Sequence, residues 1–172
     1  MRRVRLLASQ GQGGTAVKRE RTARLLSCFV DGAPATKGSY RPVTNRASGK
    51  TLLVGMNRNE HAWRRHVAAV VRSQWFREHP STPMPCVDEP LTVTADFYLP
   101  RPKSVHRPLP SVSPDIDKLA RCLLDALTDS RLIKDDSRIV GLDTTKRYAA
   151  AEGIGVALTV RTIHTKDTKE PS

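Results

Sequence analysis

Regular spacings of apolar residues mark the main elements of this chain. Leu91–Leu99 alternates apolar residues with Thr92, Thr94, Asp96 and Tyr98, a pattern that predicts a strand with one buried face. Residues 59–78 instead repeat apolar positions at helical spacing, with arginines on the opposite side; the apolar positions are Trp63, Val67, Val70, Val71 and Trp75. A second amphipathic helix is predicted over residues 116–128, with Ile116, Leu119, Leu123 and Leu127 on one face. Asn57 or Asn59 would cap the first helix.

Shorter apolar runs predict further strands over residues 25–30, 51–54, 138–142, 145–149 and 155–163, and the segment 33–50 is interpreted as a long loop. This order lacks the regular strand–helix alternation of a doubly wound sheet. It predicts an α+β fold, a single small domain over residues 25–164 with a mixed β-sheet and two main helices. Residues 1–24 are expected to form a disordered basic arm, and residues 165–172 a frayed C-terminal tail.

The charge of the chain points to a polyanionic partner. Twenty-nine Lys and Arg residues against 17 Asp and Glu residues give a net charge of +12. The arm holds only part of this excess, so the body is basic as well. The odd number and wide spacing of Cys28, Cys86 and Cys122 argue against a disulfide framework or a zinc site. No apolar run is long enough for a signal peptide or a membrane span, so we expect a cytoplasmic protein with no membrane contact.

Aspartates cluster in one short stretch that contains no glutamate: Asp115, Asp117, Asp125, Asp129, Asp135 and Asp136. Solvated helix faces use Glu freely, so restriction to the shorter carboxylate indicates positioned side chains. Carboxylate oxygens are ligands that Mg²⁺ prefers, and metal-dependent phosphodiester cleavage combines such ligands with a basic surface that gathers DNA.

Structural roles compete with metal binding at most of these positions. Asp115 precedes the second helix and could cap it. Asp117, Arg121 and Asp125 share one helix stripe, so Arg121 either pairs with these neighbours or reaches the scissile phosphate. Asp129 is typical of the turn that ends a helix. Only one of the neighbouring Asp135 and Asp136 would face a site, because adjacent side chains point to opposite sides of an extended segment. Composition alone leaves a metal site and a set of caps and ion pairs equally open.

The residues around this cluster resemble a known family. Residues 114–128 (PDIDKLARCLLDALT) and 132–140 (LIKDDSRIV) closely resemble the RusA family of Holliday-junction resolvases, with its D-x-D-N-L motif, L-D-A-L-T helix and D-D-x-x-V segment. PATKGSYRP (34–42) is similar to the family's early P-x-x-K-G-R-P-R loop. The resemblance extends over residues 25–163. It implies a small homodimeric α+β endonuclease, often encoded by a phage, that cuts branched DNA with magnesium.

The resemblance also implies roles for individual residues. Asp115, Asp117 and Asp136 match the catalytic, metal-binding carboxylates. Arg121 stands where the family has a functional lysine, and it would keep the positive charge without readily donating a proton. Lys146 matches the lysine after the third aspartate, whereas Lys118 replaces the usual asparagine. Asp125 falls on a position that is not catalytic in the family, which favours a structural role.

The sequence therefore predicts a Mg²⁺-dependent endodeoxyribonuclease, with Mn²⁺ able to substitute, that cuts four-way or other branched DNA as a homodimer. Each subunit is expected to hold metal with Asp115, Asp117 and Asp136, while Arg121 neutralises phosphate. The expected DNA-binding residues are Lys37, Arg41, Lys118 and Lys146. Two alternatives are a phage-type flap or branch nuclease without junction preference and a non-catalytic nucleic-acid-binding protein.

Overall fold

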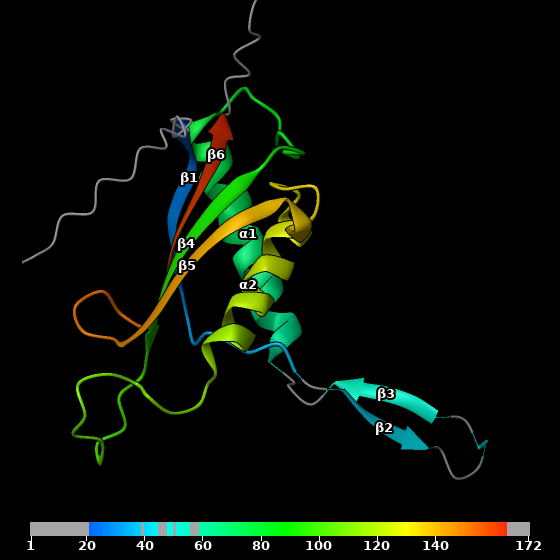
Figure 1. The fold of residues 1–172 in the computed structure, drawn as a ribbon, viewed down its shortest axis with the longest axis vertical. Helices are drawn as coiled ribbons and strands as arrows, with labels where there is room; N and C mark the ends of the chain where they lie inside the picture. The colour runs from blue at the N-terminus through cyan, green and yellow to red at the C-terminus, as the bar shows by residue number, and fades with distance from the viewer. Residues whose placement is uncertain (1–20, 39, 45–47, 50, 56–58, 165–172) are drawn as a thin grey trace, which may run out of the picture.

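A computed structural model describes residues 21–38, 40–44, 48–49, 51–55 and 59–164, and the elements follow the predicted order (Figure 1). The strands are β1 (Arg21–Asp31), β2 (Tyr40–Thr44), β3 (Thr51–Gly55), β4 (Leu91–Leu99), β5 (Ile139–Tyr148) and β6 (Gly155–His164). The helices are α1 (Glu60–Glu78), α2 (Ile116–Ser130) and the short 3-10 helix η1 (Asp136–Arg138). Residues 1–20 of the predicted arm and the tail 165–172 lie outside the described residues. Residues 21–24, predicted as part of the arm, belong to β1.

The four long strands form one mixed sheet in the order β1-β6-β4-β5. β6 pairs antiparallel with both β1 and β4, whereas β5 pairs parallel with β4. Along β4 each apolar residue is buried and each intervening residue is partly exposed, as the alternation predicts. The two helices lie on the same face of the sheet (Figure 1). This arrangement confirms the predicted α+β fold with a mixed sheet and two main helices.

The core lies between the sheet and the two helices. α1 buries Trp63, Val67, Val71 and Trp75, so the two tryptophans pack inside the protein. α2 buries the apolar side chains of its inner face, including Leu119, Leu123, Leu127 and the free thiol Cys122. These faces are the ones that the helical spacing predicts. Within the described residues, no helix is both long and apolar enough to cross a membrane.

Two predicted elements differ in the structure. The runs 138–142 and 145–149, predicted as separate strands, form the single strand β5. Backbone pairing with β4 carries β5 through its polar middle, where Asp143 pairs with Thr94. The predicted loop 33–50 contains β2, which pairs with β3 in a hairpin that stands apart from the main sheet (Figure 1). Polar residues can form such strands because cross-strand backbone hydrogen bonds do not depend on an apolar side chain.

The path from β4 to β5 determines where the aspartates lie. Parallel strands require the chain to return to the end where the first strand began, and α2 makes this return. α2 therefore starts near the carboxyl end of β4 and finishes near the amino end of β5 (Figure 1). Residues just before α2 and residues just after it consequently lie at opposite ends of the sheet.

Candidate active site

Asp115 and Asp117 lie at the exposed start of α2. Asp115 occupies the N-cap position with extended backbone angles, yet its side chain makes no capping hydrogen bond. Its carboxylate instead contacts the Lys118 ammonium at 3.1 Å, and both side chains are about half exposed. Asp117 lies in the first helical turn and is exposed. The helix dipole favours negative charge at this end, and both carboxylates are accessible to a cation.

Lys146 supports the loop that leads into these aspartates. It lies near the end of β5, opposite Phe97 of β4, on the side of the sheet that the helices cover. Its ammonium donates hydrogen bonds to the carbonyl oxygens of Val112 and Pro114, at 2.7 and 2.8 Å. Lys146 thus ties the carboxyl end of β5 to the residue that precedes Asp115.

Asp136 lies far from the other two predicted ligands within one subunit. It begins η1, immediately before β5, whereas Asp115 begins α2. The 15 residues of α2 separate them by roughly 22 Å at 1.5 Å per residue. Among the described residues, no three His, Cys, Asp or Glu side chains come together so that they could hold a metal ion. The expectation that one subunit gathers all three carboxylates does not agree with this topology, because the parallel β4–β5 pairing places Asp136 at the other end of the sheet.

Asp135 and Asp136 differ in their local contacts. The Asp135 carboxylate accepts a hydrogen bond from the Ser137 backbone N–H at 2.9 Å and caps η1. This hydrogen bonding from Ser137 lowers the pKa of Asp135. Asp136 is exposed and is not the residue that caps η1. The structure therefore agrees with a supporting role for Asp135 and leaves the Asp136 carboxylate accessible.

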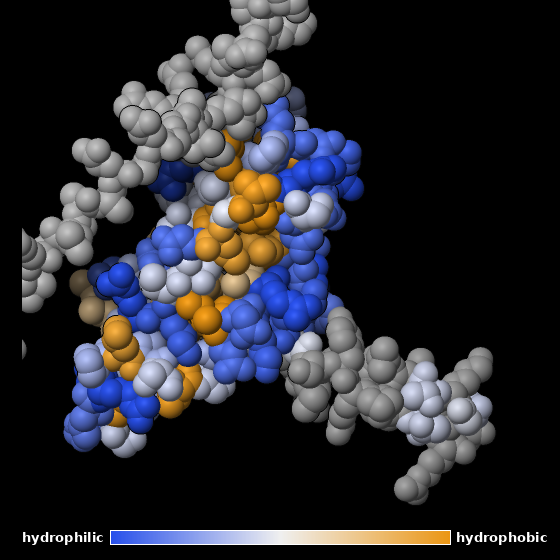
Figure 2. All heavy atoms as spheres, in the orientation of Figure 1, coloured by the Kyte–Doolittle hydropathy of each residue, from blue (hydrophilic) through white to orange (hydrophobic). Residues whose placement is uncertain are grey.

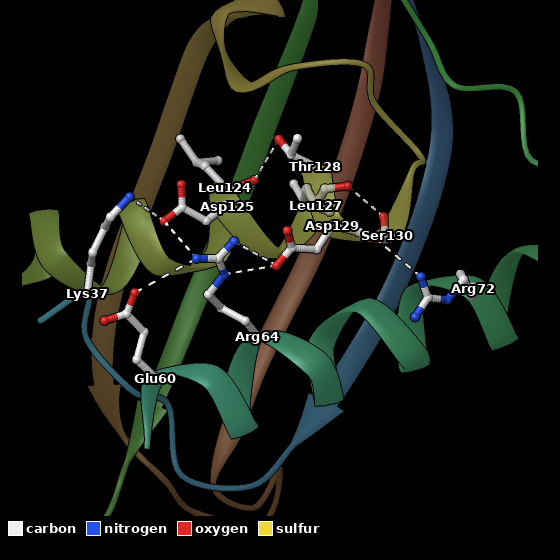
Figure 3. A network of polar contacts seen from close by, with 10 residues as sticks. All are labelled: Lys37, Glu60, Arg64, Arg72, Leu124, Asp125, Leu127, Thr128, Asp129 and Ser130. Carbon is white, nitrogen blue, oxygen red and sulfur yellow. Dashed lines mark hydrogen bonds and ion pairs between the residues drawn. The ribbon is translucent and has the colours of Figure 1, made fainter. Parts of the chain in front are cut away.

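An ion-pair network joins α1, α2 and the segment before the hairpin (Figure 3). Asp125 contacts the Lys37 ammonium at 2.5 Å and the Arg64 guanidinium at 3.7 Å. Arg64 also binds Asp129 at 2.7 Å and approaches Glu60 at 3.9 Å. Asp125 therefore has structural partners, as its position in the helix motif suggests, and these partners are Lys37 and Arg64.

Glu60 extends this network to the loop. It is almost fully buried, and its carboxylate accepts a hydrogen bond from the Gly38 backbone N–H at 2.7 Å. The backbone N–H of Lys37 in turn donates to the carbonyl oxygen of Lys118 at 2.9 Å. The early loop and the first turns of α2 are thus connected by both backbone and side-chain contacts.

The remaining predicted residues have different surroundings. Arg121 is exposed on α2, one turn after Asp117. Arg41 lies in β2, but its side chain is outside the described part of the chain. Lys37 is predicted to bind DNA, and its ammonium is held by Asp125.

Sequence reasoning missed the part that Arg64 plays. Its helical position places it on the side opposite the apolar face, and this position did not indicate a contact with α2. In the structure it bridges α1 and α2 through Asp125 and Asp129. The only available signal was the spacing of Glu60 and Arg64, four residues apart, which is typical of an intrahelical pair.

The chemistry of the donors fits a hard cation at the start of α2. Mg²⁺ takes oxygen ligands in an octahedral arrangement and commonly keeps several waters, so one or two protein carboxylates can suffice. Asp115 and Asp117 supply such oxygens, and neither is buried. The basic neighbours Lys118 and Arg121 offer compensating charge for a polyanion.

Comparison with known proteins identifies the family. The family model described as Endodeoxyribonuclease RusA matches residues 31–159, a span that holds both helices and Asp115, Asp117 and Asp136. No curated protein sequence matches the chain. Since the matched span covers about three quarters of the chain, the protein belongs to the RusA family of endodeoxyribonucleases.

Proposed function

We propose that this protein is a magnesium-dependent endodeoxyribonuclease that cuts branched DNA, in particular four-way junctions, by attack of water on the phosphodiester. The family match carries this proposal, because it covers the two helices and the three predicted catalytic carboxylates. The accessible pair Asp115 and Asp117 at the start of α2 adds support, together with the net charge of +12. Large positive charge with a small acidic focus suits a nuclease that must attract DNA and also hold a cation.

Asp115 and Asp117 are the residues that would hold the metal in this proposal. A bound Mg²⁺ would activate water and neutralise charge on the phosphate, and Mn²⁺ is expected to substitute. Lys118 pairs with Asp115 in the free protein and would be released to a phosphate when a cation takes its place. Arg121 would contact phosphate through its guanidinium, which neutralises charge but does not readily donate a proton.

We further propose a homodimer in which Asp136 acts on the site of the partner subunit. Within the described sheet β5 is an edge strand, and its Val140 and Leu142 side chains are 66% and 46% exposed. Figure 2 shows apolar surface in this region. Antiparallel pairing of two β5 strands about a two-fold axis would place the start of each strand beside the end of the other. Asp136 would then approach Asp115 and Asp117 of the partner subunit.

The basic residues have unequal parts in the proposed DNA contact. Lys118 and Arg121 flank the carboxylates directly on α2. Lys146 would act mainly by holding the loop before Asp115, and its charge would add to the local potential. Lys37 would contribute only weakly, because Asp125 already compensates its charge. Arg41 extends the proposed basic surface onto the hairpin.

Replacement of Asp117 by asparagine tests the metal assignment. The change keeps the shape of the side chain and removes the anionic ligand, so cleavage of a four-way junction in Mg²⁺ should be lost while junction binding persists. Asp129→Asn is a matched control on the same helix, because Asp129 pairs with Arg64 and has no proposed contact with metal. Cleavage by Asp117→Asn at the wild-type rate would contradict the proposal.

Mixing two inactive variants tests the contribution of Asp136 across the dimer. Subunits carrying Asp117→Asn and subunits carrying Asp136→Asn should each be inactive alone. After equal mixing and exchange, half of the dimers would be mixed and one of the two sites in each would be intact, which gives about a quarter of the wild-type activity. No recovery, despite subunit exchange shown by mass spectrometry, would place Asp136 outside the partner's site.

A cleavage assay on several DNA substrates separates the proposed function from its alternatives. Rates on four-way junctions, flaps and plain duplex, compared at one enzyme concentration, distinguish a junction resolvase from a general branch nuclease. Binding without cleavage of any of these DNAs at every Mg²⁺ or Mn²⁺ concentration would instead indicate a non-catalytic nucleic-acid-binding protein.

A further inference from the structure

A mostly apolar cavity of about 310 Å³ lies beside the loop that leads to Asp115. Its walls come from the end of β4, the loop over residues 100–114, the end of β5, and the Ala33–Pro34 segment. Proline rings and aliphatic side chains make up most of the surface, and Tyr148 is the aromatic residue among them. The volume falls at the lower end of the range of roughly 300–1,000 Å³ that is usual for small-ligand sites.

The hydroxyl of Tyr148 has no hydrogen-bond partner among the described residues, although the oxygen is buried. A buried polar group without a partner costs roughly 1–3 kcal/mol, so such a group calls for an explanation. The Arg101 guanidinium lies 5.4 Å from the centre of the Tyr148 ring. Arg101 also donates hydrogen bonds to the carbonyl oxygens of Val105 and His106, both at 3.1 Å, and so holds the loop closed on itself. The cavity therefore offers an apolar interior with Tyr148 in its wall and a guanidinium at its edge.

Positive charge surrounds this apolar interior. Arg101, Lys103 and Arg107 are exposed on the loop over residues 100–114. Lys146 donates hydrogen bonds to the carbonyl oxygens of Val112 and Pro114, near the end of the same loop. Figure 2 shows apolar atoms interspersed with hydrophilic side chains at this end of the molecule. A ligand that suits these walls has a flat apolar body and an attached anion. A nucleotide has both, whereas an apolar peptide segment has no anion for the basic residues of the loop to bind.

The cavity directly adjoins the proposed metal ligands. Pro114 lines the cavity and Asp115 is the next residue. We propose that the cavity receives an unstacked base of the DNA strand, next to the phosphate that is cut. The inference rests on the proposed nuclease function and deepens it. Branched DNA supplies such a base at reduced cost, because pairing and stacking are already weakened at the branch. Tyr148 would contact the base through its ring, and the loop cations would hold the flanking phosphates.

Removal of single bases from the DNA tests this proposal. Four-way junctions carrying an abasic residue at each position around the mapped cut are bound in Ca²⁺, so that affinity is measured without cleavage. For the wild-type protein, one position next to the cut should bind roughly tenfold more weakly when the base is missing. Removal of bases elsewhere should change the affinity little.

Variants of the cavity complete the experiment. Val105→Trp fills the cavity and should bind the intact junction roughly tenfold more weakly, with no further loss at the sensitive abasic position. Val105→Ala, the matched control, leaves the cavity open and should keep the response to the missing base. Tyr148→Phe removes a hydroxyl that has no partner in the free protein. Because this hydroxyl is buried without a partner, its removal should raise the melting temperature, while the ring that lines the cavity and the binding of the intact junction should be kept.

Each outcome decides a separate point. Wild-type protein that cuts the junction but ignores the missing base at every position overturns the cavity proposal and leaves the nuclease function intact. So does Val105→Trp with normal affinity and an undiminished base response. If Val105→Trp instead changes the oligomeric state without changing the base response, the cavity serves a protein contact and the proposal fails. A wild-type protein that neither binds nor cuts branched DNA overturns the proposed function itself.

Discussion

Replacement of Asp125 by alanine should weaken the contact between the two helices without removing the proposed nuclease site. Asp125 contacts Lys37 at 2.5 Å and Arg64 at 3.7 Å, and the three side chains are 16%, 26% and 22% exposed. Breaking a fully buried pair costs roughly 3–5 kcal/mol, whereas an exposed pair contributes roughly 0–1 kcal/mol. The partial burial places Asp125→Ala between these limits, at about 2 kcal/mol. Arg64 keeps Asp129, which limits the loss.

Urea unfolding and thermal unfolding both measure this loss. A change of about 2 kcal/mol should lower the melting temperature by roughly 4–8 °C in a domain of this size. A double-mutant cycle with Lys37→Met isolates the Lys37–Asp125 contact, because both partners are then removed together. We expect a coupling energy of about 1 kcal/mol, since both side chains are partly exposed.

The cleavage assay gives the outcome that would refute this reasoning. Below its melting temperature, Asp125→Ala should cut a four-way junction at close to the wild-type rate. A variant with unchanged stability and no cleavage would place Asp125 in the metal site. In that case the ion pairs of Asp125 with Lys37 and Arg64 would exist only in the free protein and would be broken when metal or DNA binds.

Three further substitutions or modifications test the packing and the thiols. Gly155→Ala would place a methyl group 2.3 Å from the carbonyl oxygen of Val30, so the variant should lose roughly 1–3 kcal/mol in urea unfolding; an unchanged midpoint would contradict the close strand packing. Leu123→Ala empties a fully buried position of α2 and should cost roughly 3 kcal/mol by the same measurement. Burial raises the pKa of the Cys122 thiol to about 12, so iodoacetamide at neutral pH should label exposed Cys86 first, as mass spectrometry of peptides would show; fast labelling of Cys122 would refute its burial.

The elements with strong apolar periodicity were predictable from the sequence. Leu91–Leu99 and the two helices each bury one regular face, and the physical cause of that burial is the spacing itself. The local position of Asp115 before α2 was also predictable. The absence of a capping bond from its carboxylate was not, because N-cap residue types are chosen for that bond in most helices.

The distance between Asp136 and the other aspartates could not be predicted from their separation along the chain. This distance depends on whether β5 runs parallel or antiparallel to β4. The apolar pattern of a strand is the same in a parallel and in an antiparallel pair, so the sequence does not reveal the direction. The full length of β5 could not be predicted from the apolar pattern either. At the edge of a sheet, residues such as Asp143 remain solvated, so an exposed strand carries a weak apolar signal.

The early loop is positioned to support the start of α2, where the proposed metal ligands lie, more than to contact DNA directly. The Lys37 side chain binds Asp125 and its backbone N–H binds the Lys118 carbonyl, so two contacts nearly two helical turns apart fix this segment along α2. Ala33 and Pro34, a few residues earlier, form one wall of the cavity beside Asp115. The same loop therefore holds the helix that carries the carboxylates and shapes the cavity next to them. Because the helix and the cavity wall share this anchor, a change at Lys37 should affect base binding and stability together, whereas a change at an ordinary phosphate-binding lysine would alter binding alone.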